Sequence, residues 1–323
     1  MSIRSAFRCG MAGALALSCH LGQAGNLAAA SAAHLMPQPS ALVGPAPVSA
    51  PHHGGLYRVS RDGRVAYLFG TVHVGASSLY PLAPEVSRAL SSARRVVVEL
   101  DVDAGAAFAR AVARHGRYPE GDHILNHIGR DTLADMTERL HAHGVSVSSM
   151  SRYKPWLVAN LLLSMELERA GYRRRDGVER VLLQAARRRG AAVAELESAD
   201  YQLGLFDTMN DIDAERYLRE TLRGLDDGSV MRRARAVLAA WTSGDAQALD
   251  ALLHDATAGR GVVEDFTRRV LLGRRNPQMV AHIEQLMRQD GVAFVGVGLL
   301  HLLGANGLPQ LLAQRGYLVE QVY

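Results

Sequence analysis

Short apolar runs alternate with helical patterns at both ends of this chain, around a long helical middle. The first two runs flank an Asp-Gly turn at residues 62–63 and read as a hairpin. Two later runs are apolar on both faces, which is typical of strands buried within a sheet. Strands are expected at residues 56–60, 65–69, 95–101, 191–197, 292–298 and 317–322.

Helical spacing of apolar positions fills the intervals between these strands. Helices are expected at residues 84–92, 104–115, 130–143, 155–170, 177–189 and 307–314, with almost continuous helix over 200–289. Strands that alternate with helices at both ends predict an α/β fold. We expect a mixed β-sheet flanked by helices, with a long helical insertion between its N- and C-terminal sheet segments.

The first 33 residues have the pattern of a secretory signal peptide. Arg4 and Arg8 precede an apolar run from Cys9 to Cys19, and small residues follow. The run is shorter than the roughly 20 apolar residues that cross a bilayer. The sequence therefore predicts an exported, periplasmic protein, with cleavage and release favoured over a lipid anchor at Cys19. No later segment is long enough to predict a transmembrane span.

The segment that follows, residues 34–54, is rich in proline and alanine and predicts a disordered leader. No linker-like stretch interrupts the rest, so residues 55–323 are expected to form a single domain. Both cysteines lie in the signal peptide. The exported chain would have no thiol, which excludes a cysteine nucleophile and leaves nitrogen and oxygen as metal ligands.

The formal charge of +4 does not indicate a nucleic-acid partner. The arginines of 173–175 and 187–189 lie in segments that also carry acids, so solvated faces are favoured. Aromatic residues that would stack on bases are not interleaved with them. The sequence also has no Gly-x-Ser-x-Gly nucleophile elbow and no Walker or Rossmann fingerprint.

Two distant segments repeat one pattern, an apolar strand that ends in Gly-x-x-His. They are residues 70–73 and 298–301, and Glu99 ends a third strand. Sites in α/β sheets gather at the carboxyl ends of strands. Two imidazoles and a carboxylate, here His73, His301 and Glu99, are a common ligand set for a catalytic divalent metal. Structural hydrogen bonding of the histidines and pairing of Glu99 with an arginine remain alternatives.

A second histidine pair is a weaker candidate. His123 and His127 are four residues apart, a spacing that would put both on one helix face. No third ligand accompanies them, and Gly121 and Asp122 precede them. We favour the interpretation that both histidines lie at the surface or at the start of a helix.

Further segments carry a family resemblance over residues 55–323. With the three strand ends at 69–73, 97–101 and 295–304, they occur in the order found in the TraB/GumN family, which the chain resembles. That family is related to the Tiki proteins, described as metal-dependent proteases with paired Gly-x-x-His motifs. The further segments are Lys154-Pro155-Trp156, Asp176-Gly177-Val178-Glu179, Ala194-Glu195-Leu196-Glu197-Ser198, Arg275-Asn276-Pro277-Gln278-Met279 and Gly307-Leu308-Pro309-Gln310-Leu311-Leu312.

The resemblance implies a metal-dependent hydrolase, peptidase-like, that acts on a peptide or protein. Its divalent ion, Mn, Co or Zn, would be bound by His73, Glu99 and His301. Arg275 and Asn276 would be catalytic residues beside it. An arginine there would stabilise the oxyanion that forms when water attacks a carbonyl; the alternative is a structural pairing of Arg275 with Glu99 or a neighbouring acid.

The chain departs from the family pattern in two places. Two other functions also remain possible. Glu179 stands where the family often has aspartate, and Leu299-Leu300 where smaller residues are common. The first alternative is a non-catalytic periplasmic protein that binds a peptide, haem or a cell-surface polysaccharide component. The second is a metal-free hydrolase in which one histidine is the general base.

Overall fold

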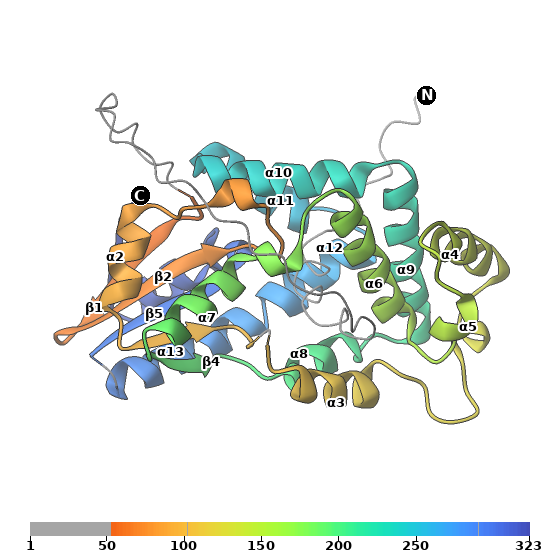
Figure 1. Ribbon diagram of the computed structural model, residues 1–323, viewed down its shortest axis with the longest axis horizontal. Helices are drawn as coiled ribbons and strands as arrows, with labels where there is room; N and C mark the ends of the chain where they lie inside the picture. The colour runs from red at the N-terminus through yellow and green to blue at the C-terminus, as the bar shows by residue number, and fades with distance from the viewer. Residues whose placement is uncertain (1–52, 102, 290) are drawn as a thin grey trace, which may run out of the picture.

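The computed structural model describes residues 53–101, 103–289 and 291–323. The predicted signal peptide, and the predicted leader up to residue 52, lie outside the described residues. A β-sheet with its covering helices occupies one side of the molecule, and a group of helices occupies the other (Figure 1). The chain therefore combines the two parts that its sequence pattern predicts.

The sheet has six strands in the order β4-β3-β5-β2-β1-β6. Strands β4, β3, β5 and β2 run parallel, whereas β1 is antiparallel to both β2 and β6. The sheet is therefore mixed, as predicted. The strands are β1 (Leu56–Arg61), β2 (Arg64–Thr71), β3 (Arg95–Val98), β4 (Ala192–Glu195), β5 (Val292–Gly298) and β6 (Leu318–Gln321).

Helices connect these strands and form the insertion. The α-helices are α2 (Pro84–Ser92), α3 (Gly105–His115), α4 (Arg130–Ala142), α5 (Val147–Met150), α6 (Pro155–Arg169), α7 (Val178–Arg188), α8 (Ala199–Phe206), α9 (Asp211–Asp226), α10 (Ser229–Ser243), α11 (Ala246–Thr257), α12 (Val262–Phe266), α13 (Arg275–Gln289) and α14 (Leu308–Gln314). Short helices are η1 (Ser77–Leu79), η2 (Ile124–Asn126), η3 (Arg174–Asp176), the π-helical η4 (Thr267–Leu272) and η5 (Leu299–Leu302). In the described part of the chain, no helix has the length and apolar character needed to cross a membrane.

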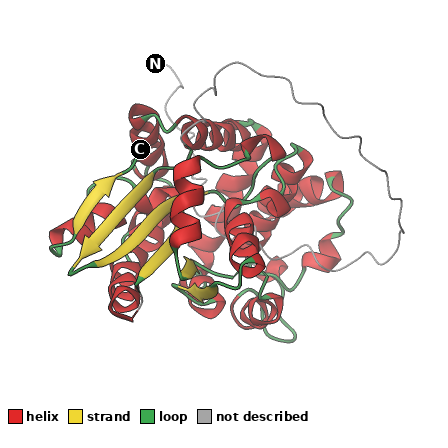
Figure 2. Cartoon of the chain, turned by 60° about the vertical axis from the view of Figure 1, so that its left-hand side comes forward, coloured by secondary structure: helices red, strands yellow, loops and turns green. Residues whose placement is uncertain are grey.

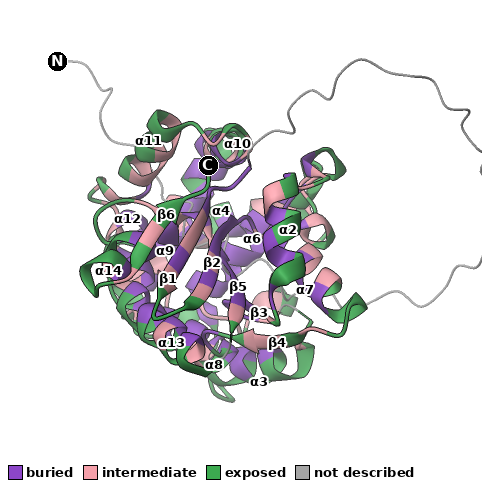
Figure 3. Cartoon of the chain, turned by 90° about the vertical axis from the view of Figure 1, so that its left-hand side faces the viewer, coloured by how far each residue is buried: buried purple, intermediate pink, exposed green. Residues whose placement is uncertain are grey.

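Both faces of the sheet are covered by helices (Figure 2). Successive side chains of a strand point to opposite faces, so Val96 and Phe294 pack with residues of α2 and α7. Their neighbours Val97 and Val295 pack with residues of α13 and α14 on the other face. Buried residues consequently run along the central strands (Figure 3). This burial on two sides explains why these strands have continuous apolar sequence.

The helical part has its own core, built around aromatic rings. Trp156 of α6 stacks on Phe206 of α8 with ring centroids 5.2 Å apart. Phe266 of α12 lies 4.7 Å from the same phenylalanine ring, and Tyr217 of α9 meets it edge-on. Aromatic pairs of this kind add about 0.5–1.5 kcal/mol each beyond their burial. This cluster holds α6, α8, α9 and α12 together in a core separate from those of the sheet.

Several boundaries differ by a few residues from those predicted, and two of these differences matter here. Strand β3 ends at Val98 rather than at residue 101, which makes Glu99 the first residue beyond the strand. At the N-terminus, His53 and Gly54 belong to the predicted leader but pack on α10. The His53 ring stacks on Trp241 at 5.1 Å, and the Gly54 amide donates to the Trp241 carbonyl. Contact with the folded part thus begins two residues before residue 55.

Candidate functional site

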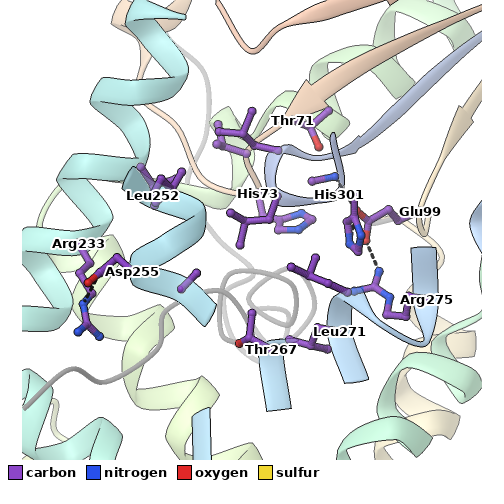
Figure 4. A pocket seen from close by; sticks show the side chains of 17 residues that line it. Thr71, His73, Glu99, Arg233, Leu252, Asp255, Thr267, Leu271, Arg275 and His301 are labelled. Carbon is purple, nitrogen blue, oxygen red and sulfur yellow. Dashed lines mark hydrogen bonds and ion pairs between the residues drawn. The ribbon is translucent and has the colours of Figure 1, made fainter. Parts of the chain in front are cut away.

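Three strand ends converge on one pocket. Strands β2, β5 and β3 are parallel neighbours, with Thr71 opposite Gly298 and Val98 opposite Gly296. The residues beyond these ends, His73, Glu99 and His301, all line the same pocket, whose empty volume is about 780 Å³ including its open mouth. Figure 4 shows the three side chains grouped at one end of it. The structure therefore brings together the three residues that the sequence singled out.

Gly298, the glycine of the second motif, lies at the centre of this group. A Cβ atom there would be 3.1 Å from Glu99 Oε1, 3.6 Å from His301 Cδ2 and 3.8 Å from His73 Nε2. Its backbone, with φ −51° and ψ 136°, is open to any residue, so the missing side chain rather than the conformation explains the glycine. Its amide also donates to Glu99 Oε1 over 2.5 Å.

The imidazole of His301 is held in one tautomer. Its Nδ1 lies 2.5 Å from Asn276 Oδ1, and the Asn276 amide nitrogen donates to the carbonyl of Asn306 over 2.7 Å. The amide oxygen only accepts, so Nδ1 carries the proton and donates. Nε2 therefore keeps its lone pair and lies 3.5 Å from Glu99 Oε1. Asn276 thus orients His301.

Burial also keeps this imidazole neutral. Loss of solvation lowers the pKa of His301 to about 3, with Arg275 and His73 acting in the same direction and Glu99 opposing them. A neutral ring with a free Nε2 is the form that binds metals or accepts a proton.

His73 lies next to a carboxylate on the other side of Gly298, at ion-pair distance but without the geometry of a hydrogen bond. Its Nδ1 lies 2.9 Å from Glu179 Oε1, and the Thr71 hydroxyl donates to the same oxygen. Glu179 stands in the first turn of α7, and its carboxylate reaches across to β2. Here too Nδ1 faces an acceptor. The glutamate at this position is therefore compatible with holding the first histidine.

Glu99 is ionised and fixed by donors on both oxygens. Oε2 accepts from Arg275 Nη2, and Oε1 accepts from the Gly298 amide. Burial by itself would raise the pKa of Glu99, but Arg275, the two histidines and the amide outweigh it and lower the pKa to about 2. Arg275 does not engage Oε1, which is the oxygen that faces His301.

Arg275 is buried between two carboxylates. Its Nε lies 3.0 Å from both oxygens of Glu197, and Nη2 lies 2.7 Å from Glu197 Oε2. Gln202 also donates to Glu197. One guanidinium therefore faces two buried carboxylates, and a third buried acid, Glu179, contacts His73 of the same pocket. A buried excess of negative charge is costly unless a cation balances it.

The helix before Arg275 departs from regular α geometry. Residues Thr267–Leu272 form the π-helical η4, between α12 and α13. Thr267, Leu271 and Leu272 all line the pocket, as does Arg275. A π-helical turn changes which side chains share a face and occurs frequently at functional sites. Apolar periodicity over this stretch gave no sign of it.

The donor set suits a borderline divalent cation, although the side chains do not enclose one. Within residues 53–101, 103–289 and 291–323, no group of three or more His, Cys, Asp or Glu side chains is arranged to hold a metal ion. Two ligands that bind one ion at about 2.1 Å with a tetrahedral angle lie roughly 3.4 Å apart. The 3.5 Å between His301 Nε2 and Glu99 Oε1 agrees with that spacing.

The remaining sequence candidates have other roles. His127 lies 2.9 Å from both Asp122 and Asp211, away from the pocket, and His123 is exposed. Of the two alternatives left open for Arg275, the structure contains the pairing with acids. Glu197 was missed as its second partner, although it comes two residues after β4, next to the strand that leads to Glu99.

The neutral state of His301 gives a testable dependence of stability on pH. An unfolded imidazole is protonated below about pH 6.5, whereas folded His301 is protonated only near pH 3. Between these values the unfolded chain binds more protons, so metal-free protein is expected to lose stability as pH falls, by up to about 1.4 kcal/mol per pH unit. Thermal midpoints from about pH 7 to 4 should decline more steeply for wild type than for His301→Gln. Equal slopes would refute the assignment.

Comparison with known proteins agrees with the motifs. A model of the TraB/PrgY/gumN family matches residues 55–321. Two relatives, described as "Uncharacterized protein YbaP", come from Shigella flexneri and Escherichia coli strain K12. The first is 27% identical over 250 residues, 77% of this chain and 88% of the relative. The second is 27% identical over 247 residues, 76% and 87% of the respective chains. No solved structure matches. The chain belongs to the TraB/PrgY/gumN family.

Proposed function

We propose that this protein is an exported, metal-dependent hydrolase that cleaves peptide bonds. Its divalent ion, Mn, Co or Zn, would be bound by His73, Glu99 and His301. One observation carries the proposal: His301 is anchored through Nδ1 to Asn276, and His73 Nδ1 lies at ion-pair distance, 2.9 Å, from Glu179 Oε1. His301 Nε2 then faces Glu99 Oε1, and His73 Nε2 lies on the same side of the pocket, close to Gly298.

This anchoring is typical of metal sites in proteins. A histidine that binds a metal nearly always donates its other ring N–H to a carboxylate or a carbonyl oxygen, which fixes the ring and its tautomer. The buried excess of carboxylates supports a cation in the same place. When bound, such an ion supplies a nucleophilic water at neutral pH and polarises the substrate carbonyl.

Arg275 and Asn276 act in this proposal as positioning residues. The contacts of Arg275 hold Glu99 in its ionised form and aim Oε1 at His301. Asn276 fixes the His301 tautomer. Both side chains are buried, and their hydrogen bonds lead to other protein groups. This assigns them a different task from the direct catalytic role that the family resemblance implied.

The apolar walls of the pocket suit an uncharged stretch of substrate. Val237, Leu252, Leu271 and Leu299 line it beyond the polar end. Such walls exclude water and strengthen the electrostatic interactions at the reacting group. Helix α11 covers this region, and most of its residues are exposed or half-buried. This helix therefore forms a wall between the pocket and solvent.

Incubation with a mixture of synthetic peptides tests the proposal. Mass spectrometry should detect new peptide termini, which a chelator abolishes and one of Mn, Co or Zn restores. His301→Ala should reduce cleavage at least about 100-fold. His123→Ala, which replaces an exposed histidine, is the matched control.

Cleavage that persists in the presence of chelators would instead indicate a metal-free hydrolase. Saturable binding of peptides without any cleavage would indicate a binding protein. Either result would overturn the proposed function.

A further inference from the structure

The pocket has a second polar end, opposite the three strand ends. Arg233 of α10 and Asp255 of α11 line it, and Arg233 Nε lies 2.9 Å from Asp255 Oδ2. The two side chains are 13% and 30% exposed, so solvent reaches them only in part. Figure 4 shows this pair on the far side of the pocket from His301 and Glu99. Apolar side chains such as Leu252 lie between the two ends.

Arg233 has donors that protein acceptors do not use. A guanidinium carries five N–H groups, and Asp255 is close to the one on Nε. In the part of the chain that the structure describes, Arg233 Nη1 is buried without a hydrogen-bond partner. Its distance to Glu264 Oε1 is 4.0 Å, too long for a hydrogen bond. A buried donor left unsatisfied costs about 1–3 kcal/mol.

Glu264 is a poor counter-charge for Arg233. Its side chain is fully buried, and this burial raises the pKa of its carboxyl group. Both of its oxygens lack a hydrogen-bond partner among the described residues. Asp255, at 2.9 Å, is therefore the acid in direct contact with Arg233, whereas Glu264 stays at 4.0 Å. An acceptor from outside the chain would give Nη1 the hydrogen bond that these neighbours do not.

Resting on the proposed function, we infer that Arg233 binds a carboxylate of the substrate, in a subsite that Asp255 positions. The planar fork of a guanidinium matches a carboxylate in two parallel hydrogen bonds. The apolar wall next to it would accept an apolar side chain. The C-terminal carboxylate of a peptide that ends in an apolar residue has both features. The substrate class is therefore peptides with a free C-terminus, cleaved a short distance from that end.

Binding of short probes tests this subsite without requiring turnover. The probes are acetyl-leucyl-leucine as the free acid, the same dipeptide as its C-terminal amide, and acetyl-leucyl-glutamate amide. Calorimetry is done on the full chain with and without added Zn or Mn. The free acid is expected to bind at least about tenfold more tightly than the leucine amide, as one charge-assisted bidentate contact implies. If wild type binds the free acid and the leucine amide with equal affinity, that result by itself overturns the inference.

Variants then assign the effect to Arg233. Arg233→Met should abolish the preference for the acid, whereas Arg235→Met, an exposed arginine on the same helix, should keep it. If Arg233→Met does not fold, Arg233→Lys keeps the positive charge without the planar fork and should weaken the preference for the acid. A preference that survives in folded Arg233→Met would refute the role of this arginine.

The third probe distinguishes the source of the carboxylate. Binding of the glutamate amide as tightly as the free acid would assign the subsite to an acidic side chain instead of the C-terminus. If the protein neither binds metal nor cleaves peptides, the difference in affinity between the acid and the amide probes can still be measured. Failure of the proposed function is thus distinct from failure of this inference.

Discussion

Replacing Arg275 by methionine is expected to lower the free energy of unfolding by about 3–5 kcal/mol. Arg275 is 2% exposed and is the cation that contacts Glu99 and Glu197, both buried. Methionine fills similar volume but leaves the two carboxylates facing each other without a positive charge. One of them would then have to take up a proton, so the loss should be larger at neutral than at acidic pH. Urea denaturation measures the change, and Arg274→Met, at the exposed neighbouring position, is the control.

A second substitution isolates the charge from the packing. In the Arg275→Met background, Glu197→Gln removes one of the two carboxylates and should recover part of the lost stability. In wild type the same change leaves Arg275 with Glu99 alone and should be destabilising. Opposite signs in the two backgrounds would establish the coupling. A loss below about 1 kcal/mol in Arg275→Met would contradict the buried network.

Gly298→Ala is expected to remove metal binding while the protein stays folded. The added methyl group would lie 3.1 Å from Glu99 Oε1 and 3.8 Å from His73 Nε2, in the space between the proposed ligands. Because the backbone there is ordinary, the fold should tolerate alanine. We expect metal affinity and peptide cleavage to fall at least about 10–100-fold, the range seen when the groups that support ligands are disturbed.

The matched control for this variant is Gly291→Ala, at the residue just before β5. A Cβ atom at Gly291 would meet nothing within 4 Å. Its metal affinity and thermal midpoint should therefore equal those of wild type. Unchanged metal binding in folded Gly298→Ala would argue that the ion, if bound, lies elsewhere.

The sequence predicted the strand ends of the site because buried strands have a strong local pattern. Continuous apolar runs located β3 and β5, and the Gly-x-x-His ends placed His73 and His301 beyond parallel strands. Burial on both faces of the sheet produces that pattern directly. The fold class followed from the alternation of strands with helices. These features depend on neighbours in the chain, which sequence reasoning can read.

The groups that hold these residues were not predicted, because they depend on tertiary contacts. Glu197 reaches Arg275 only because β4 lies beside β3 at the edge of the sheet. Asn276 meets His301 through the packing of α13 against η5. Arg233, in the helical insertion, has no local pattern that links it to the strand ends. Spacing along the chain contains no information on such pairs.

Titration of chelator-treated protein with Zn, Mn and Co tests the central claim most directly. We expect wild type to bind at least one of these metals, with one ion per chain. The variants His73→Ala and His301→Ala should lose most of that affinity while remaining folded. The exposed-histidine variant His123→Ala should bind as wild type does. The proposed metal site would be contradicted if wild type binds none of the three ions. It would also be contradicted if wild type and both site variants bind them equally.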